Sequence, residues 1–448
     1  MNSGDTAWLL VSTALVMLMT PGLALFYGGM VQGKNVLSTF MHSFMALGII
    51  TIQWVVIGYS LSFGTDHGSG FIGGLNFAFL DGVGMDPQEG KTYPHILFMM
   101  FQGMFAIITP ALISGAYAER MKFSAYLIFT LLWATLVYDP ICHWVWGPGG
   151  WLAKKGALDF AGGTVVHLIS GVSALVVAMV MGKRLGYPHT RHQPHNLTMT
   201  LIGAGLLWFG WFGFNAGSAL AANGVAAQAL VNTHIAAAAG AFAWALVEMM
   251  RIKKATMLGV ASGLVAGLVG ITPAAGFVTP MGAILIGVAA GVVCYGACLV
   301  KNRLGYDDAL DAFGIHGVGG ALGALLTGVL ASSPVVTAAL GIDLTAEGAA
   351  PHPGGLINGN SDLLIAQLYG VVAAAAYAAG ATFLILKAIQ VTIGLRVDAD
   401  VEREGLDVNL HGETGYTLGT SSVLGAAQDR EDEPAKVPAV ASLALSED

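Results

Sequence analysis

Two histidines stand in similar surroundings within long uncharged stretches of this 448-residue sequence. His167 lies in DFAGGTVVHLISG and His316 in DAFGIHGVGGALG, so each follows an aspartate and is flanked by glycine. Asp159 and Asp311 are suited to cap a helix start, because a carboxylate accepts backbone N–H groups there. Each neutral imidazole offers one donor and one acceptor. A buried pair is therefore suited to bind a small neutral solute or to relay a proton by exchanging tautomers.

Aromatic residues form a second group. Phe101 and Phe105 are four apart in FMMFQGMFAIIT, Trp146 ends the run HWVW, and Phe214 precedes Ser218 in FGFNAGS. Aromatic faces attract small cations, and a hydroxyl oxygen accepts a hydrogen bond from an ammonium-like ion. The alternative interpretation is an ordinary aromatic belt at a membrane interface. Both readings place these rings near the end of a membrane-spanning segment.

Signatures of enzymes and metal sites are missing from the sequence. It contains no GxSxG, P-loop, HExxH or CxxC pattern, and its three cysteines form no disulfide framework. No basic patch indicates nucleic acid as a partner. We therefore expect no enzyme activity, no metal and no cofactor.

The composition indicates what must position these residues. Of all residues, 55% are hydrophobic and 10% are charged, whereas soluble domains carry about 25% charged residues. The sequence predicts an all-α integral membrane protein with eleven spans of about 20 residues each. The expected spans are 7–30, 37–63, 95–118, 123–145, 161–182, 197–217, 226–250, 257–275, 282–300, 313–331 and 363–393.

The charges predict the orientation and a tail. With the N-terminus outside, sixteen of the nineteen basic residues fall inside, and only Lys91, Lys154 and Lys155 fall outside. Basic residues favour the cytoplasmic side, so we expect the N-terminus outside and the C-terminus in the cytoplasm. Residues 396–448 carry the whole net charge of −8. This predicts a transmembrane domain over 1–395, a cytoplasmic regulatory segment over 396–416 and a disordered acidic tail over 417–448.

The two histidine segments fall in the fifth and tenth expected spans. If spans one to five and six to ten are inverted repeats, His167 and His316 occupy equivalent positions and meet near the membrane midplane. Glycines four apart, as at Gly319 and Gly323, allow helices to approach closely in lipid. We therefore expect a tight bundle that encloses a narrow path.

Several segments resemble the ammonium transporter family (Amt/MEP, related to the Rh proteins), in its bacterial or archaeal form. They are FYGGMVQGKN, ALDFAGGTVVH, WFGWFGFNAGSA, DAFGIHGVGG and GLRVDADVEREGLDVNLHGE, in that order. The resemblance covers about 5–416. It implies eleven transmembrane helices, namely two inverted five-helix repeats and one extra C-terminal helix, in a homotrimer with one channel per subunit. It also implies a PII-type signal protein as a partner of segment 394–416.

The resemblance implies roles for particular residues. The outer ammonium site would comprise Phe101, Phe105, Trp146 and Ser218. Phe105 and Phe214 would form a stacked gate, His167 and His316 the proton relay, and Asp159 a buried support of the outer site.

The resulting hypothesis is transport of ammonium or methylammonium across the cell membrane for nitrogen uptake. The ion would lose its proton at the outer site, and ammonia would then cross an apolar lumen. The main alternative is an ammonium sensor that signals through its C-terminal tail. An Rh-like gas channel and a proton-coupled symporter are further alternatives.

Overall fold

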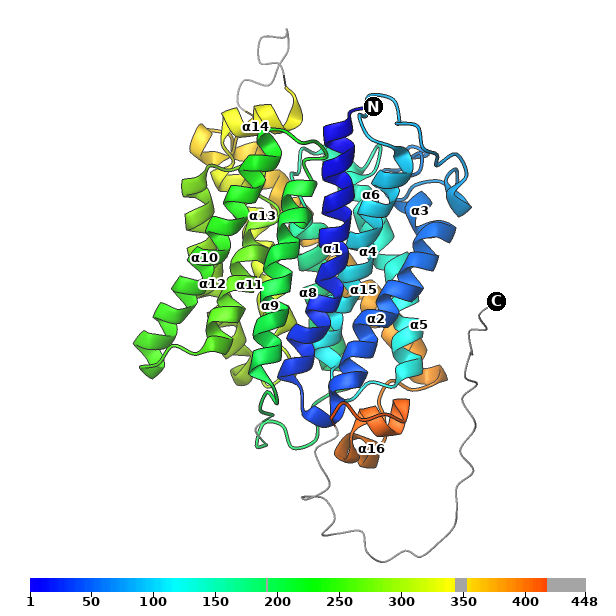
Figure 1. Cartoon of the computed structure of the whole chain (residues 1–448), viewed down its shortest axis with the longest axis vertical. Helices are drawn as coiled ribbons and strands as arrows, with labels where there is room; N and C mark the ends of the chain where they lie inside the picture. The colour runs from blue at the N-terminus through cyan, green and yellow to red at the C-terminus, as the bar shows by residue number, and fades with distance from the viewer. Residues whose placement is uncertain (191, 343–352, 417–448) are drawn as a thin grey trace, which may run out of the picture.

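The computed structural model describes residues 1–190, 192–342 and 353–416, and these form a bundle of helices that run roughly along one axis (Figure 1). The first half contains α1 (Ser3–Met30), η1 (Gly33–Asn35), α2 (Val36–Gln53), η2 (Trp54–Gly58), α3 (Tyr59–Phe63), η3 (Ala78–Leu80), α4 (His95–Tyr117), α5 (Phe123–Trp133), η4 (Ala134–Tyr138), α6 (Asp139–Trp146), α7 (Trp151–Lys154), η5 (Gly163–Leu168) and α8 (Ile169–Met181). The second half contains α9 (Leu197–Trp211), η6 (Phe212–Ala216), α10 (Gly224–Ile252), α11 (Met257–Ile271), α12 (Pro280–Leu304), η7 (Phe313–Gly317), α13 (Val318–Leu330), α14 (Ser333–Leu340), η8 (Leu356–Asn358), α15 (Ser361–Thr392), α16 (Ala399–Glu404) and η9 (Asp407–His411).

The expectation of an all-α membrane fold is confirmed. Within the described residues, ten helical segments are long and apolar enough to cross a bilayer, and α11 is a shorter apolar helix packed between α10 and α12. These eleven segments coincide with the eleven expected spans to within a few residues at each end. The fourth span continues through Asp139 and Pro140, because the π-helical turn η4 runs directly into α6, which has Pro140 in its first turn.

Several spans contain a π-helical turn. The turns η2, η4, η5, η6 and η7 each interrupt or begin an apolar helix. A π-helical turn inserts an extra residue and shifts the side chains that follow it, and such turns are frequent at functional sites. His167 lies on η5, Phe214 on η6 and His316 on η7, so three of the expected site residues stand on such turns.

Close glycine contacts bring η5–α8 and η7–α13 together. A Cβ atom at Gly171 would lie 2.0 Å from the backbone N of Gly317, and one at Gly320 would lie 2.7 Å from the carbonyl oxygen of Gly163. Any larger residue would push the two backbones apart. This contact, which only glycine allows, juxtaposes the segments that carry the two histidines.

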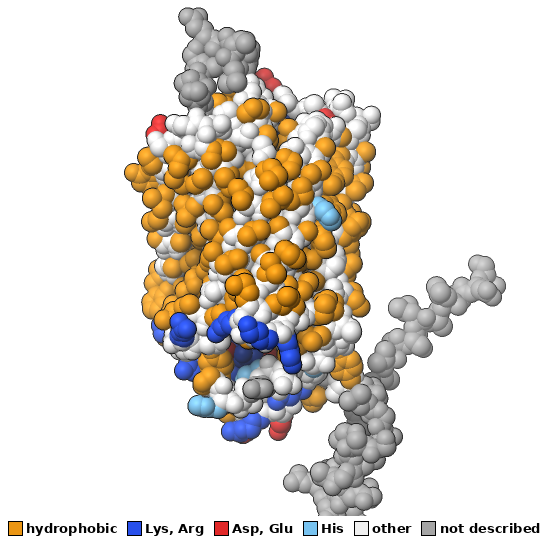
Figure 2. All heavy atoms as spheres, turned by 90° about the vertical axis from the view of Figure 1, so that its left-hand side faces the viewer, with side chains coloured by type: hydrophobic (Ala, Val, Ile, Leu, Met, Phe, Trp, Pro, Cys, Tyr) orange, Lys and Arg blue, Asp and Glu red, His pale blue; other side chains and the backbone are white. Residues whose placement is uncertain are grey.

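The two ends of the bundle differ in their polar residues. The N-terminus and α14 lie at one end and α16 at the other (Figure 1). Figure 2 shows a tall hydrophobic band on one face, with Lys and Arg side chains gathered below it. We call the two ends the N-side and the C-side. The expected acidic tail, 417–448, lies outside the described residues.

Candidate functional site

A cavity of about 350 Å³ opens at the N-side of the bundle. We call it the N-side cavity. Its wall combines aromatic rings with a few polar groups, and it includes Phe105, Trp146, Asp159, Phe160 and Ser218. Four residues expected from the sequence to act together are therefore brought to one cavity. A concave site with mostly apolar walls and few polar groups is typical of a small-ligand site.

Three residues of the N-side cavity are fixed by contacts that leave their aromatic faces or hydroxyl oxygen available to a ligand. They are Phe105, Trp146 and Ser218. The indole Nε1 of Trp146 donates to the carbonyl oxygen of Asp159 at 2.8 Å, and its ring meets that of Phe105 edge-on at 6.0 Å. The hydroxyl of Ser218 donates to the carbonyl oxygen of Phe214 at 2.8 Å. Because that hydroxyl proton is already used, the Ser218 oxygen faces a ligand as an acceptor. The arrangement suits a small cation that carries N–H donors.

Asp159 is tied to the backbone of the turn that follows it. Its Oδ1 accepts from the amides of Gly162 and Gly163 at 2.8 and 2.7 Å, and its Oδ2 accepts from those of Thr164 and Val165 at 2.8 and 3.1 Å. Gly162 has φ +114°, a left-handed conformation that favours glycine. Four charge-assisted bonds fix the carboxylate in place, so it supports the start of η5 and the Trp146 contact.

Phe105 lines the N-side cavity and packs on Phe214, which lies beyond the cavity wall. Their ring centroids are 4.4 Å apart with a tilt of 41°, and both side chains are buried. The structure places Phe101 behind this pair, edge-on to Phe105 at 5.0 Å. Phe101 is not among the residues that line the cavity, so its contact with a ligand there would be indirect.

A narrow lumen lies beyond the two rings. It offers about 10 Å³, which is roughly the space of one water molecule. Apart from the two imidazoles its wall is made of apolar and aromatic side chains: Met19, Leu23, Phe26, Ile108, Leu112, Val166, Leu207, Trp211, Phe214 and Val265. An unpaired ion would be strongly disfavoured in such a space.

His167 and His316 meet in this lumen. Their Nδ1 atoms are 3.2 Å apart, and their rings are nearly parallel at 20°. One Nδ1 must donate to the other, so one Nε2 is an acceptor and the other carries a proton. His167 Nε2 is buried and has no partner among the described residues, while its ring stacks on Trp211 and Phe214 at 5.3 and 5.9 Å. The pair therefore presents hydrogen-bonding groups to whatever enters the lumen.

The expectation that Asp311 plays the part of Asp159 in the second repeat is wrong. Asp308, which is fully buried, accepts from the amide of Phe313 at 2.8 Å through Oδ2 at the start of η7. Asp308 precedes His316 by eight residues, as Asp159 precedes His167. Asp311 instead forms an ion pair with Lys301 at 2.6 Å. An aspartate does precede the glycine-flanked histidine and caps the turn, as expected. It is Asp308 and not Asp311.

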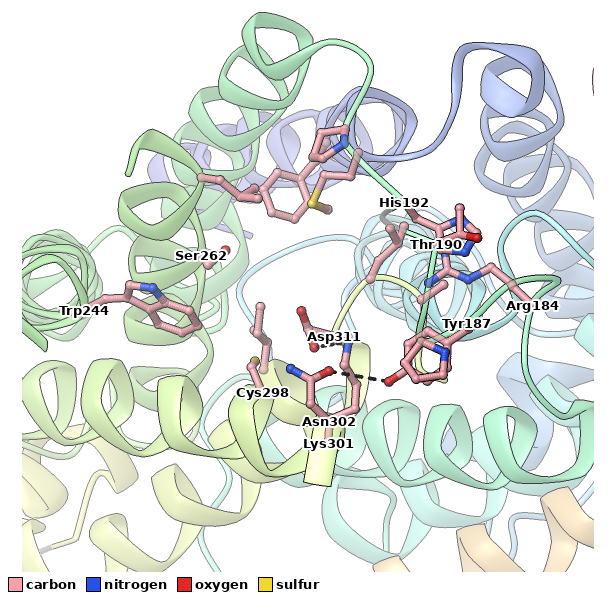
Figure 3. A pocket seen from close by; sticks show the side chains of 18 residues that line it. Arg184, Tyr187, Thr190, His192, Trp244, Ser262, Cys298, Lys301, Asn302 and Asp311 are labelled. Atoms are coloured by element: carbon pink, nitrogen blue, oxygen red, sulfur yellow. Dashed lines mark hydrogen bonds and ion pairs between the residues drawn. The ribbon is translucent and has the colours of Figure 1, made fainter. Parts of the chain in front are cut away.

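A larger cavity of about 550 Å³ opens at the C-side. We call it the C-side cavity. Figure 3 shows Lys301, Asn302 and Asp311 together, with Arg184 and His192 grouped to one side and Trp244 and Ser262 to the other. Its wall includes Arg184, Lys301 and Asp311, whereas the charged residues that line the N-side cavity are Lys91 and Asp159.

A buried charge network borders the C-side cavity. Arg184 pairs with Asp307 at 2.8 Å and with Glu119 at 2.7 Å. Burial alone would raise the pKa of Asp307, but hydrogen bonds and charge from Arg184 lower it to about 2. Arg184 likewise holds the pKa of Glu119 below its usual range against the effect of burial. Burial raises the pKa of Asp308 to about 6.

Sequence reasoning missed this network. The segment NRLGYDDALDAFG (302–314) concentrates three aspartates beside Lys301. In the sequence, Lys301 and Arg184 indicate only the orientation, as two of the sixteen basic residues expected inside. The partners of Arg184 and Lys301 come from the turn after α4 and from the loop after α12, whereas Arg184 itself lies after α8. Sequence spacing does not relate these segments.

The sequence of the chain is similar to those of known proteins. Residues 7–416 match the sequence model of the Ammonium Transporter Family. An ammonium transporter of Bacillus subtilis (strain 168) is 52% identical over 418 residues, which cover 93% of this chain and 99% of the relative. Ammonium transporter Amt1 of Archaeoglobus fulgidus is 49% identical over 417 residues, 93% of this chain and 100% of the relative.

The fold comparison agrees with the sequence comparison. The crystal structure of Saccharomyces cerevisiae Mep2 superposes with a TM-score of 0.83 at 40% identity, covering 89% of this chain and 88% of the other. Matches of this extent apply to the whole bundle, including both cavities and the lumen between them. This chain belongs to the ammonium transporter family.

Proposed function

We propose that this chain moves ammonium by taking up the ion in the N-side cavity, removing a proton and passing ammonia through the lumen. Transport of ammonium follows from membership of the family, and the route is our inference. The observation that carries it is the lumen itself, a 10 Å³ apolar space whose polar side chains are the paired imidazoles of His167 and His316.

In this proposal Phe105, Trp146 and Ser218 recruit the ion. Two aromatic faces attract its charge, and the Ser218 oxygen accepts one N–H. Potassium has no N–H donor, so the hydrogen bond contributes to selectivity. Phe105 and Phe214 must move apart to admit the substrate, because their packed rings lie between the cavity and the lumen.

Deprotonation follows from the free energy of burying charge. An ammonium ion that enters the lumen loses its hydration, and no carboxylate lines the lumen to compensate. Ammonia loses far less, since the free Nε2 of His167 and its partner ring can hydrogen-bond a neutral solute. The released proton is expected to travel along the imidazole pair, which makes transport electrogenic. Neutral ammonia conduction is the alternative outcome.

The experiment is ammonium-evoked current in proteoliposomes on a solid-supported membrane. The His167→Ala/His316→Ala double variant is expected to lose the current or its preference for ammonium over potassium. Gly171→Ala is a second probe, since its Cβ would meet Gly317 and separate the two segments. Gly205→Ala is the matched control, because nothing lies within 4 Å of that position. Unchanged current and selectivity in the double variant would contradict the role of the histidines.

We also propose that the N-terminus is outside and the C-side faces the cytoplasm. The Lys and Arg side chains below the hydrophobic band of Figure 2 support this orientation in a bacterial or archaeal cell membrane. Cysteine labelling at Lys91→Cys and Lys253→Cys with a membrane-impermeant reagent on whole cells tests it. Only the first is expected to react.

A homotrimer is proposed from the family and from one polar group on the outer surface. His234, on the membrane-spanning helix α10, is exposed and stacks on Trp208 at 5.2 Å, and Trp208 Nε1 is buried without a partner among the described residues. Polar groups that face lipid are costly, so a second copy of the chain would cover this face. Mass measurement of the detergent-solubilised protein tests the assembly.

We propose segment 396–416 as a regulatory element and its face as the docking site of a PII-type partner. Glu402 accepts from the backbone N of Leu185 at 2.7 Å and pairs with Arg396 at 2.7 Å. Asp407 accepts from the amides of Leu37 and Ser38 at 3.0 and 2.8 Å. The segment is thus bonded to two loops, one of which carries Arg184 of the C-side cavity. The name shared by the curated relatives favours a transporter over the sensor alternative.

A further inference from the structure

A lysine ammonium group lies in the wall of the C-side cavity. Lys301, near the end of α12, is only 9% exposed. Its Nζ donates to the carbonyl oxygen of Asp308 at 2.8 Å and lies 2.6 Å from Oδ1 of Asp311. A primary ammonium group is therefore bound by a carbonyl and a carboxylate, the oxygen acceptors that a free ammonium ion would need.

A second observation comes from Asp308. One of its carboxylate oxygens caps Phe313, whereas the other, Oδ1, is buried and has no partner among the described residues. Unpaired buried acceptors are rare and call for a ligand or a counter-charge. Asp311 lines the cavity and its Oδ1 lies beside Nζ of Lys301, whereas Asp308 is not among the residues that line the cavity. Both carboxylates favour the charged form of Lys301, so this part of the wall is suited to a cation.

The other cations near the cavity are already engaged. Arg184 is bound by Glu119 and Asp307, and Arg120 Nη2 donates to the carbonyl oxygen of Asp307 at 2.6 Å. Lys301 is therefore the cation that binds the carbonyl oxygen of Asp308 and the carboxylate of Asp311, while Asp308 Oδ1 keeps no partner among the described residues. Asp311 lines the C-side cavity, and Asp308 caps the turn η7 that carries His316, so the acceptors lie near the C-side of the lumen.

We propose that the C-side cavity contains an ammonium site and that Lys301 occupies it as a tethered ammonium group. An ammonium ion re-formed on this side of the lumen finds the acceptors filled and leaves. In the N-side cavity, by contrast, the Ser218 oxygen is free to accept. The arrival of ammonia through the lumen rests on the proposed function. Binding of ammonium at the C-side site does not, because it is a property of the folded chain.

The test uses Lys301→Met, which keeps an unbranched side chain as far as Cε and removes the ammonium group. The full-length variant is purified in detergent, and its thermal unfolding is followed in ammonium chloride and in potassium chloride at equal ionic strength. We expect ammonium to stabilise the variant at concentrations about tenfold lower than those needed for the wild type. Potassium should have a smaller effect on both.

Two further variants make the test specific. Lys301→Met combined with Asp311→Asn removes one acceptor and should abolish the added stabilisation. Lys154→Met is the matched control, because Lys154 is an exposed lysine paired with Asp66 at the N-side, 3.8 Å away. It should respond to ammonium as the wild type does.

The outcomes are distinguishable. Equal responses of Lys301→Met and the wild type to ammonium would overturn the proposal. A variant that folds only when ammonium is supplied would support it, and one that unfolds equally in both salts would count against it, because the vacated acceptors would then not bind ammonium. If the wild type gives no ammonium-evoked current while Lys301→Met is stabilised by ammonium, the transport route is wrong and the site remains.

Discussion

The N-side and C-side cavities begin from the same motif, an aspartate eight residues before a histidine, and differ in how that aspartate is satisfied. Asp159 has both oxygens engaged by four backbone amides. Asp308 caps one amide, leaves one oxygen unpaired and has Lys301 bound to its carbonyl. Around Asp159 the wall is aromatic, and around Asp308 it is charged.

The difference shows how two copies of one backbone pattern can serve opposite needs. A carboxylate neutralised by its own turn leaves the N-side cavity to attract a cation through aromatic faces and a hydroxyl oxygen. On the C-side, the ammonium group of Lys301 lies between the carbonyl oxygen of Asp308 and the carboxylate of Asp311, which reduces that attraction. The buried ion pairs of Arg184 with Asp307 and Glu119 fix the loop that follows α12 and carries Asp308.

The largest effect is expected from removing the buried charge network at the C-side. Arg184→Met leaves Asp307 and Glu119 buried without their counter-charge, and breaking a buried pair costs about 3–5 kcal/mol. We expect low yield and a markedly lower unfolding temperature in detergent. Arg403→Met is the matched control, since Arg403 pairs with Asp400 on the exposed surface, where such pairs contribute about 0–1 kcal/mol. Equal stability of the two variants would show that the network is not needed for folding.

A second pair of variants compares the two aspartates directly. Asp159→Asn replaces one acceptor oxygen with an N–H donor that faces two amides, and each orphaned donor costs about 1–3 kcal/mol. We expect at least a tenfold loss of ammonium-evoked current. Asp308→Asn leaves one cap bond possible, so its current should fall about threefold or less. A larger loss of current in Asp308→Asn than in Asp159→Asn would contradict the assignment of Asp159 as the support of the N-side cavity.

A smaller effect concerns pH. The pKa of Asp308 is raised by burial to about 6, so its charged form is disfavoured in the folded state, and stability should rise as pH falls from above 6 towards 4. The pKa of Asp307 is lowered to about 2, so its contribution is present above pH 4 and is lost as pH falls towards 2. Unfolding temperatures of wild type and Asp308→Asn between pH 4 and 8 test this. The variant should lack the upper of the two slopes.

The smallest effect is expected at the N-side cavity and tests the role of Ser218 in ammonium binding. Ser218→Ala removes one hydrogen-bond acceptor, which is worth roughly 0.5–1.5 kcal/mol, so the half-saturating ammonium concentration should rise about two- to tenfold. The same variant should lose part of its selectivity over potassium. Ser218→Thr retains the hydroxyl and serves as the control. An unchanged half-saturating concentration in Ser218→Ala would remove Ser218 from the site.

Much of the N-side could be predicted from local sequence. Hydrophobic length located the spans, and family motifs located Trp146, Ser218 and the two histidines. Asp159 lies within six residues of all four amides it binds, so its role is written into a short segment. Phe101 shows the limit, since its four-residue spacing from Phe105 does not reveal that it packs behind that ring instead of lining the cavity.

The sequence by itself determined an all-helical membrane bundle, because its low charge and its apolar runs leave no other fold for the backbone in lipid. It also singled out the residues to which we assign the chemistry. Only the tertiary structure decided that Asp308 replaces Asp311 as the cap, that Lys301 occupies the acceptors beside it, and that Arg184 joins Glu119 to Asp307. The reason is that these contacts join segments as far as 123 residues apart, from Arg184 to Asp307, and charge and spacing in the sequence do not specify which partners meet.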